Sequence, residues 1–184
     1  MKRTVLTFGL ISGGILSLMM VLTMPFHEAI GSDRAEVIGY TTMVVAFLLI
    51  FFGVRSYRDN VAGGTLTFGR AFKAGALIAL IASTCYVATW QVLYYGVTGD
   101  EFASSYQTQA LEKARADGAT EEELETRRAE LARYAELYRN PFINVAVTFL
   151  EPLPIALLFA LVSAAILKRK RPEDSPGMVH AGAG

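Results

Sequence analysis

FINVAVTFLEPLPIALLFALVSAAIL, residues 142–167, is an apolar stretch with a single carboxylate, Glu151, near its middle. The stretch exceeds the roughly 20 residues that a helix needs to cross a hydrocarbon core. It therefore places the chain among the integral membrane proteins. A carboxylate at that depth is costly, so it usually faces a partner or water inside a bundle. Glu151 is the strongest candidate for a functional residue in this chain.

The composition of the whole chain agrees with a membrane protein. Of its 184 residues, 53% are hydrophobic and 18% are charged, and the mean hydropathy is +0.37. Soluble domains are more strongly charged. The formal net charge is zero, and no basic run is interleaved with aromatic rings, so we expect no nucleic acid partner. With one cysteine and two histidines, the sequence offers neither a zinc ligand set nor a catalytic triad. We expect no enzyme, no cofactor and no metal.

Four segments have the length and apolarity of membrane spans. They are residues 5–24, 37–54, 74–95 and 142–167. These spans predict an all-α protein, an integral membrane four-helix bundle that occupies residues 1–171 and has the lipid bilayer around it. The tail, residues 172–184, contains prolines and ends in glycine and alanine, and we expect it to be disordered and cytoplasmic.

Basic residues gather at span ends that share one side of this predicted bundle. Cytoplasmic loops hold an excess of lysine and arginine close to the membrane. Besides the N-terminal pair, these residues are Arg55, Arg58, Arg70, Lys73, Lys168, Arg169, Lys170 and Arg171. Their distribution predicts a multi-pass protein with cytoplasmic N and C termini, and side chains that contact lipid headgroups.

Small residues recur at every fourth position in three of the spans, which allows helix backbones to approach closely. They are Gly9, Gly13 and Ser17 in the first span, Ala71, Gly75, Ala79 and Ser83 in the third, and Ala156, Ala160 and Ala164 in the fourth. We expect these stripes to pack within one bundle, and homodimerisation is the alternative. The second span has no such stripe, and we expect it to be the span that faces lipid.

The polar insert between spans three and four, residues 100–139, has a helical pattern. Asp100 is a candidate cap for a first helix, which Gly118 would end. Thr120 and Glu123 have the spacing of a capping box at the start of a second helix. We expect an extracytoplasmic helical hairpin. Its thin apolar stripe would be buried within the hairpin, against a second copy of the chain, or against a membrane or periplasmic protein.

The surroundings of Glu151 predict a broken helix. Pro152 and Pro154 each remove a backbone donor just after the acid. Counting inward from the outer ends at about 1.5 Å per residue sets Glu151 level with Tyr86. Its expected partners on the third span are Tyr86, Trp90 and Gln91. Glu151 is then either a neutral structural acid that links helices or a site that holds a proton or cation beside unwound backbone.

Two motifs at the ends of spans carry a family resemblance. Residues 55–59 read RSYRD at the end of the second span, and residues 67–75 read TFGRAFKAG at the start of the third. Together with four spans and a polar helical insert, they make the chain resemble the DUF4199 family of uncharacterised bacterial membrane proteins. The resemblance implies a location in the bacterial inner membrane. It implies no established activity and no catalytic residue.

Two functions are compatible with the sequence. The one we favour is a non-enzymatic scaffold or regulatory protein that binds partners through its extracytoplasmic hairpin. The alternative is a small proton-coupled or cation transporter, or a channel component, that uses Glu151. Four spans are few for a transporter, which favours the first function.

Overall fold

The structure is a computed structural model that describes residues 1–169. Within that range, four helical segments are long and apolar enough to cross a membrane. They are Lys2–Phe26, Arg34–Asn60, Phe68–Val97 and Pro141–Leu167. The predicted all-α four-helix bundle is confirmed, and each span extends beyond its predicted bounds. The tail at 172–184, together with Lys170 and Arg171, lies outside the described residues.

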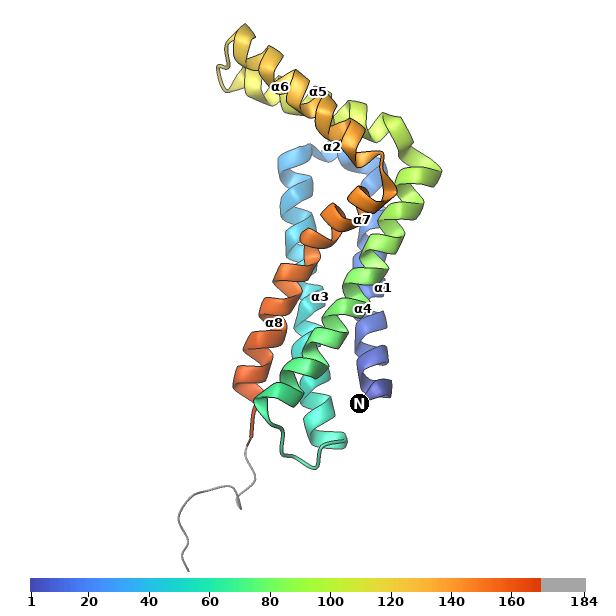
Figure 1. Cartoon of the computed structure of the whole chain (residues 1–184), viewed down its shortest axis with the longest axis vertical. Helices are drawn as coiled ribbons and strands as arrows, with labels where there is room; N and C mark the ends of the chain where they lie inside the picture. The colour runs from blue at the N-terminus through green and yellow to red at the C-terminus, as the bar shows by residue number, and fades with distance from the viewer. Residues whose placement is uncertain (170–184) are drawn as a thin grey trace, which may run out of the picture.

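The spans run side by side along the long axis of the molecule (Figure 1). In chain order the elements are α1 (Lys2–Thr23), η1 (Met24–Phe26), α2 (His27–Ile30), α3 (Ser32–Asn60), α4 (Phe68–Leu93), η2 (Tyr94–Thr98), α5 (Gly99–Ala116), α6 (Glu121–Tyr138), α7 (Pro141–Leu150) and α8 (Pro152–Leu167). The N-terminus, the connection 61–67 and the end of α8 share one end of the bundle, called the N-terminal end below. Helices α5 and α6, called the helix pair, lie at the other end.

Helix α3 supplies the largest side chains of the core. Met43, Phe47, Ile50 and Val54 are at most 2% exposed, and Phe47 packs against Phe159 of α8 with ring centroids 6.3 Å apart. The apolar window of this span is 33% buried, against 28%, 28% and 22% for the first, third and fourth spans. The prediction that the second span faces lipid is wrong, because its bulky residues fill the space left by the small residues of its neighbours.

The small-residue stripes lie inside this bundle. Gly75 of α4 faces α8 so closely that a Cβ atom there would lie 3.0 Å from the Cβ of Ala160. A Cβ on Gly13 of α1 would lie 2.6 Å from the Cβ of Cys85 on α4. Ser12 also donates a hydrogen bond across the α1–α3 interface, at 2.9 Å to the carbonyl of Ala46. Packing within one bundle is therefore confirmed for these stripes, and backbone proximity explains their small residues.

A short backbone pairing closes the N-terminal end. The Leu66 amide donates to the Arg169 carbonyl at 3.0 Å, and the Arg169 amide donates to the Leu66 carbonyl at 2.8 Å. The two residues form an isolated antiparallel bridge. It ties the connection between α3 and α4 to the residues that follow α8.

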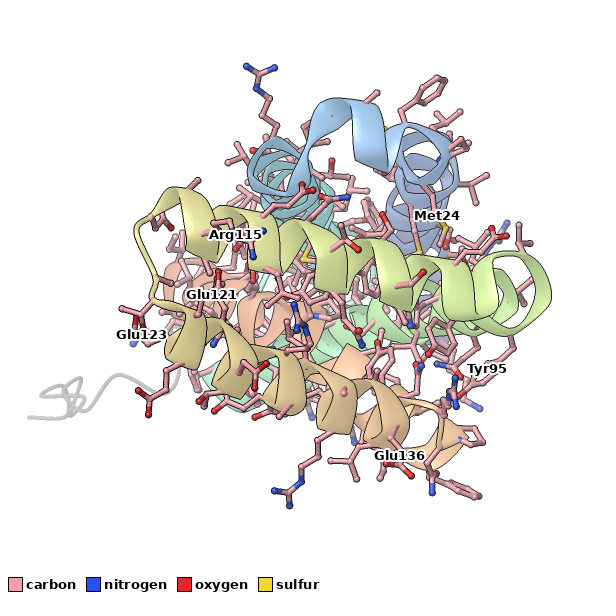
Figure 2. The ribbon with its side chains drawn as sticks, turned by 90° about the horizontal axis from the view of Figure 1, so that it is seen from above. Met24, Tyr95, Arg115, Glu121, Glu123 and Glu136 are labelled. Carbon is pink, nitrogen blue, oxygen red and sulfur yellow. The ribbon has the colours of Figure 1, made fainter. Side chains whose placement is uncertain are left out.

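The helix pair lies across the opposite end of the bundle, with its turn near Arg115 and Glu121 (Figure 2). Gly118 occupies the turn with φ of 91°, a conformation that favours glycine. The predicted capping box is confirmed, since the Thr120 side chain accepts from the Glu123 amide and the Glu123 carboxylate accepts from the Thr120 amide. The same bond to the Thr120 amide, with one from its hydroxyl, holds the pKa of Glu123 below its ordinary value.

Asp100 lies inside α5 rather than before its first residue, so the prediction that it begins the first of these helices as a cap is wrong. Helix α4 continues through η2, one stretch of π-helix, directly into α5, which begins at Gly99. The sequence has no proline between positions 26 and 140 to end the helix. The chain therefore changes direction between α4 and α5 at the π-helical turn η2, and not at a capped start of α5.

Candidate functional site

The fourth span breaks at Glu151, as the two prolines predict. Helix α7 ends at Leu150 and α8 begins at Pro152. Without amide hydrogens, Pro152 and Pro154 give no helical partner to the carbonyls of Thr148 and Leu150. Glu151 is the eleventh residue of the span Pro141–Leu167, which sets it about 15 Å in from the helix-pair end. The carboxylate thus lies well inside the apolar span.

Tyr86 is the partner of this carboxylate. The Tyr86 hydroxyl donates to Oε2 of Glu151 at 2.8 Å, across the gap between α4 and the break in the fourth span. This contact agrees with the pairing predicted from helix depth. Glu151 is exposed, although its neighbour Pro152 is buried. The carboxylate therefore faces open space rather than closely packed helices.

Trp90 and Gln91, the other two predicted partners, donate to a residue that the sequence analysis did not single out. The indole nitrogen of Trp90 lies 3.1 Å, and the amide nitrogen of Gln91 2.6 Å, from Oδ1 of Asn144. Asn144 is fully buried on α7, and its own amide donates to the Tyr138 carbonyl at 3.2 Å. Asn144 thus joins α7 to α4 and to the end of α6.

Thr148, one turn after Asn144, extends this network toward Glu151. Its hydroxyl donates to the Asn144 carbonyl at 2.7 Å and lies 3.0 Å from the Tyr138 hydroxyl. A threonine hydroxyl has one hydrogen, so Tyr138 is the donor in the second bond. Burial raises the pKa of Tyr138 above its ordinary value, and the phenol stays protonated at neutral pH. The ring of Tyr138 also packs against those of Trp90 and Tyr94.

The spacing of these residues was a signal available in the sequence. Asn144, Thr148 and Glu151 follow one another at intervals of four and three, which places them on one face of a helix. They are polar positions in an otherwise apolar run. Their shared face indicates a polar seam toward α4, with Glu151 as its deepest member.

A cavity of about 1070 Å³ lies between the helix pair and the halves of the spans that are nearest to it. Its lining includes Glu151 and Tyr86, side chains of α1 and α3, and the underside of α5 and α6. Helix α7, which precedes the break, packs against α4 and α6, whereas α8 packs against α3 and α4, and the cavity lies where α7 leaves α3. Glu151 therefore lines a half-open cavity, called the chamber below, between the spans and the helix pair.

Below this chamber the bundle is closely packed. On α4 and α8 the facing alanines, Ala79, Ala156, Ala160 and Ala164, are fully buried. Ile50 and Ile78 fill the remaining space beside them and are also fully buried. The chamber thus opens into one half of the bundle and ends at a dry interface in the other half.

The predicted topology residues that the structure describes lie at the N-terminal end. Arg55 and Arg58 are near the end of α3, Arg70 and Lys73 are in the first turns of α4, and Lys168 and Arg169 follow α8. Arg58 donates to Asp59 at 2.7 Å, and Arg55 lies 3.7 Å from the same carboxylate. Two of the expected headgroup contacts are thus paired within the chain. Which side of the membrane this end faces stays a prediction.

Within residues 1–169, no three His, Cys, Asp or Glu side chains gather in a way that would hold a metal ion. The fold and the chamber instead define a class, a helical membrane protein with a mainly apolar chamber in one half of a four-span bundle, lined in part by Glu151 and Tyr86. Residues 7–169 match the family described as "Protein of unknown function (DUF4199)", and the chain belongs to that family. No curated protein and no solved structure matches it.

Proposed function

We propose that this chain is a non-enzymatic scaffold or regulatory protein of the bacterial inner membrane that binds a partner protein through its helix pair. The proposal rests on one observation, the poor burial of α6. Leu124 is its one buried side chain among the described residues, while Tyr134 and Leu137 are 69% and 45% exposed. Helices of this size need tertiary contacts to be stable. A partner helix laid along the pair would supply them.

The charges on the exposed surface of α6 indicate which charges the surface of the partner protein should have. Its exposed residues include six acids and three bases. The acids are Glu121, Glu122, Glu123, Glu125, Glu130 and Glu136, and the bases are Arg127, Arg128 and Arg133. A partner with an apolar stripe between basic flanks would complement this surface. Lysine and arginine at the N-terminal end favour an extracytoplasmic position for the helix pair, so we propose an extracytoplasmic segment of a membrane or periplasmic protein as the partner.

Site-specific crosslinking in native membranes tests this proposal. A photoreactive phenylalanine analogue at Tyr134 should give a crosslinked band with a second protein, whereas the same analogue at Phe52, an exposed residue of α3, should not. Replacing residues 100–139 with a short flexible linker should abolish co-purification of that second protein with the chain, and Glu151→Gln should leave the crosslinked band unchanged. A band that contains only two copies of this chain, or no band from Tyr134, would overturn the proposal.

Glu151 supports a second candidate function, in which the chain handles protons or cations. The observation in its favour is a carboxylate that lies well inside an apolar span, faces a chamber and is hydrogen-bonded to a phenol. The dry alanine interface below the chamber argues against a continuous pathway in this conformation. Proteoliposome flux tests it: a pH-dependent flux that disappears in Glu151→Gln supports transport. No flux, or equal flux in that variant, would remove this candidate.

A further inference from the structure

The chamber has a charge pattern of its own, although it shares Tyr134 and Leu137 with the exposed face of the helix pair. Of the charged residues that line it, the spans contribute two, Glu36 on α3 and Glu151 at the break in the fourth span. Both are acids. We propose that this chamber binds a hydrophobic organic cation, with Glu151 as its counter-ion. The proposal does not depend on a partner protein at the helix pair, and it requires no movement of the ion across the membrane.

Aromatic rings around the chamber suit a cation without hydrogen-bond donors. They belong to Tyr40, Tyr86, Trp90, Tyr94, Tyr106, Tyr134 and Tyr138. The face of an aromatic ring attracts an ammonium or phosphonium centre, and this attraction strengthens when the site excludes water. Trp90 and Tyr94 lie with ring centroids 5.6 Å apart. Carboxylate and rings together form a site for an organic cation rather than for a metal ion, which would need more oxygen ligands.

The basic residues of the chamber lie away from Glu151. Lys113 and Arg127 belong to the helix pair, on either side of the turn that also holds Asp117. This turn is the part of the pair farthest along the chain from its attachments to α4 and α7. Arg127 lies 3.8 Å from Glu130. The chamber is therefore acidic beside the fourth span, and its positive charges are confined to the helix pair.

The remaining side chains that line the chamber are apolar and flexible. They indicate that the ligand has hydrophobic groups around its cationic centre. It includes Leu16, Met19, Met20, Met43, Ile143 and Val147. Methionine side chains are flexible and polarisable, so they fit ligands of varied shape. The volume of about 1070 Å³ matches the upper end of small-molecule sites. A cation with several rings would fill such a chamber better than a simple amine.

Two ions of equal shape and opposite charge provide the test. Tetraphenylphosphonium and tetraphenylborate are matched in size, and each can be titrated into the full-length protein in lipid nanodiscs by calorimetry. Trp90 is the only tryptophan of the chain, so its emission reports directly on the chamber. We expect saturable binding of the phosphonium with a change in Trp90 emission, and binding of the borate at least about tenfold weaker because like charges repel.

Two variants test whether Glu151 causes the preference of the chamber for the phosphonium over the borate. Glu151→Gln keeps the size of the side chain and an acceptor for Tyr86, and we expect it to weaken phosphonium binding by about tenfold or more. Glu125→Gln, at an exposed position on α6 outside the chamber, should bind as the wild type does. Circular dichroism checks that both variants are folded.

Equal binding of the two ions by the wild type, or equal phosphonium binding by Glu151→Gln and wild type, would overturn the proposal. If Glu151→Gln does not fold, the preference of the wild type between the two ions decides alone. Loss of the crosslink at Tyr134 with intact phosphonium binding would reject the partner protein and leave the cation site standing.

Discussion

Gly13 and Gly14 on α1 allow the packing of α1 against α4 to be measured with neighbouring substitutions. A Cβ atom at Gly13 would lie 2.6 Å from the Cβ of Cys85 and 3.3 Å from the Cα of Ala82, whereas ordinary contact begins at 3.4 Å. At Gly14 a Cβ atom would meet nothing within 4 Å. Because the atoms near Gly13 are fixed to the backbone of α4, alanine at this position forces the helices apart.

The magnitudes follow from overpacking and helix propensity. Inserting a methyl group into a packed interface costs about 1 to 3 kcal/mol. Replacing glycine by alanine inside a helix returns roughly 0.5 to 1 kcal/mol. Gly13→Ala should therefore destabilise the fold by up to about 2.5 kcal/mol, while Gly14→Ala should be neutral or stabilising by up to about 1 kcal/mol. The two variants share the same change in helix propensity, so their difference isolates the contact with α4.

Unfolding of the purified protein in mixed micelles, followed by circular dichroism as the denaturing detergent increases, gives the two free energies. We expect Gly13→Ala to unfold at a lower detergent fraction than wild type, and Gly14→Ala at an equal or higher one. Equal unfolding of the two variants would refute the close approach of α1 and α4 at Gly13.

Three further predictions concern the helix pair and the polar seam of α7. Thr120→Ala should destabilise the first turn of α6 by about 1 kcal/mol, seen as faster amide hydrogen exchange there and unchanged exchange in α8. The lowered pKa of Glu123 stabilises the same turn at neutral pH, and this contribution should disappear as the pH falls below the ordinary value of 4.5 through the lower folded pKa. In Glu123→Gln the protection of these amides should no longer change over that pH range. Asn144→Ala should cost about 1 to 3 kcal/mol, because it removes the acceptor of the Gln91 amide and one contact of the Trp90 indole. A shift in Trp90 emission checks it, and unchanged emission with wild-type stability would contradict the network.

Much of the fold was predictable from the sequence because it depends on local properties. The apolarity of residues 142–167 decides that this segment crosses a membrane, whatever its neighbours are. The break at Glu151 follows from Pro152 alone, since a missing amide hydrogen acts within one turn. The pairing of Glu151 with Tyr86 followed from depth, because helices that cross the same slab place residues of equal depth near each other.

Other features depend on neighbours and were not predictable in this way. The burial of α3 depends on the space that alanine and glycine leave on α4 and α8. The bulky residues of α3 taken alone therefore gave the wrong prediction that this span faces lipid. The role of Asn144 depends on which face of α7 turns toward Trp90. The continuous passage from α4 into α5 depends on a π-helical turn. Aspartate is a common capping residue, so Asp100 predicts a helix start at this place rather than a continuous helix.

The bridge between Leu66 and Arg169 also bears on the order in which the protein is assembled. Synthesis proceeds from the N-terminus, so α1, α3 and α4 have entered the membrane before Arg169 is made. An antiparallel bridge fixes the register of two strands to a single residue. This register between the connection 61–67 and the end of the last span therefore forms only after position 169 has been synthesised. A nascent chain halted before that point would contain the first three spans but would lack the backbone bridge between Leu66 and Arg169.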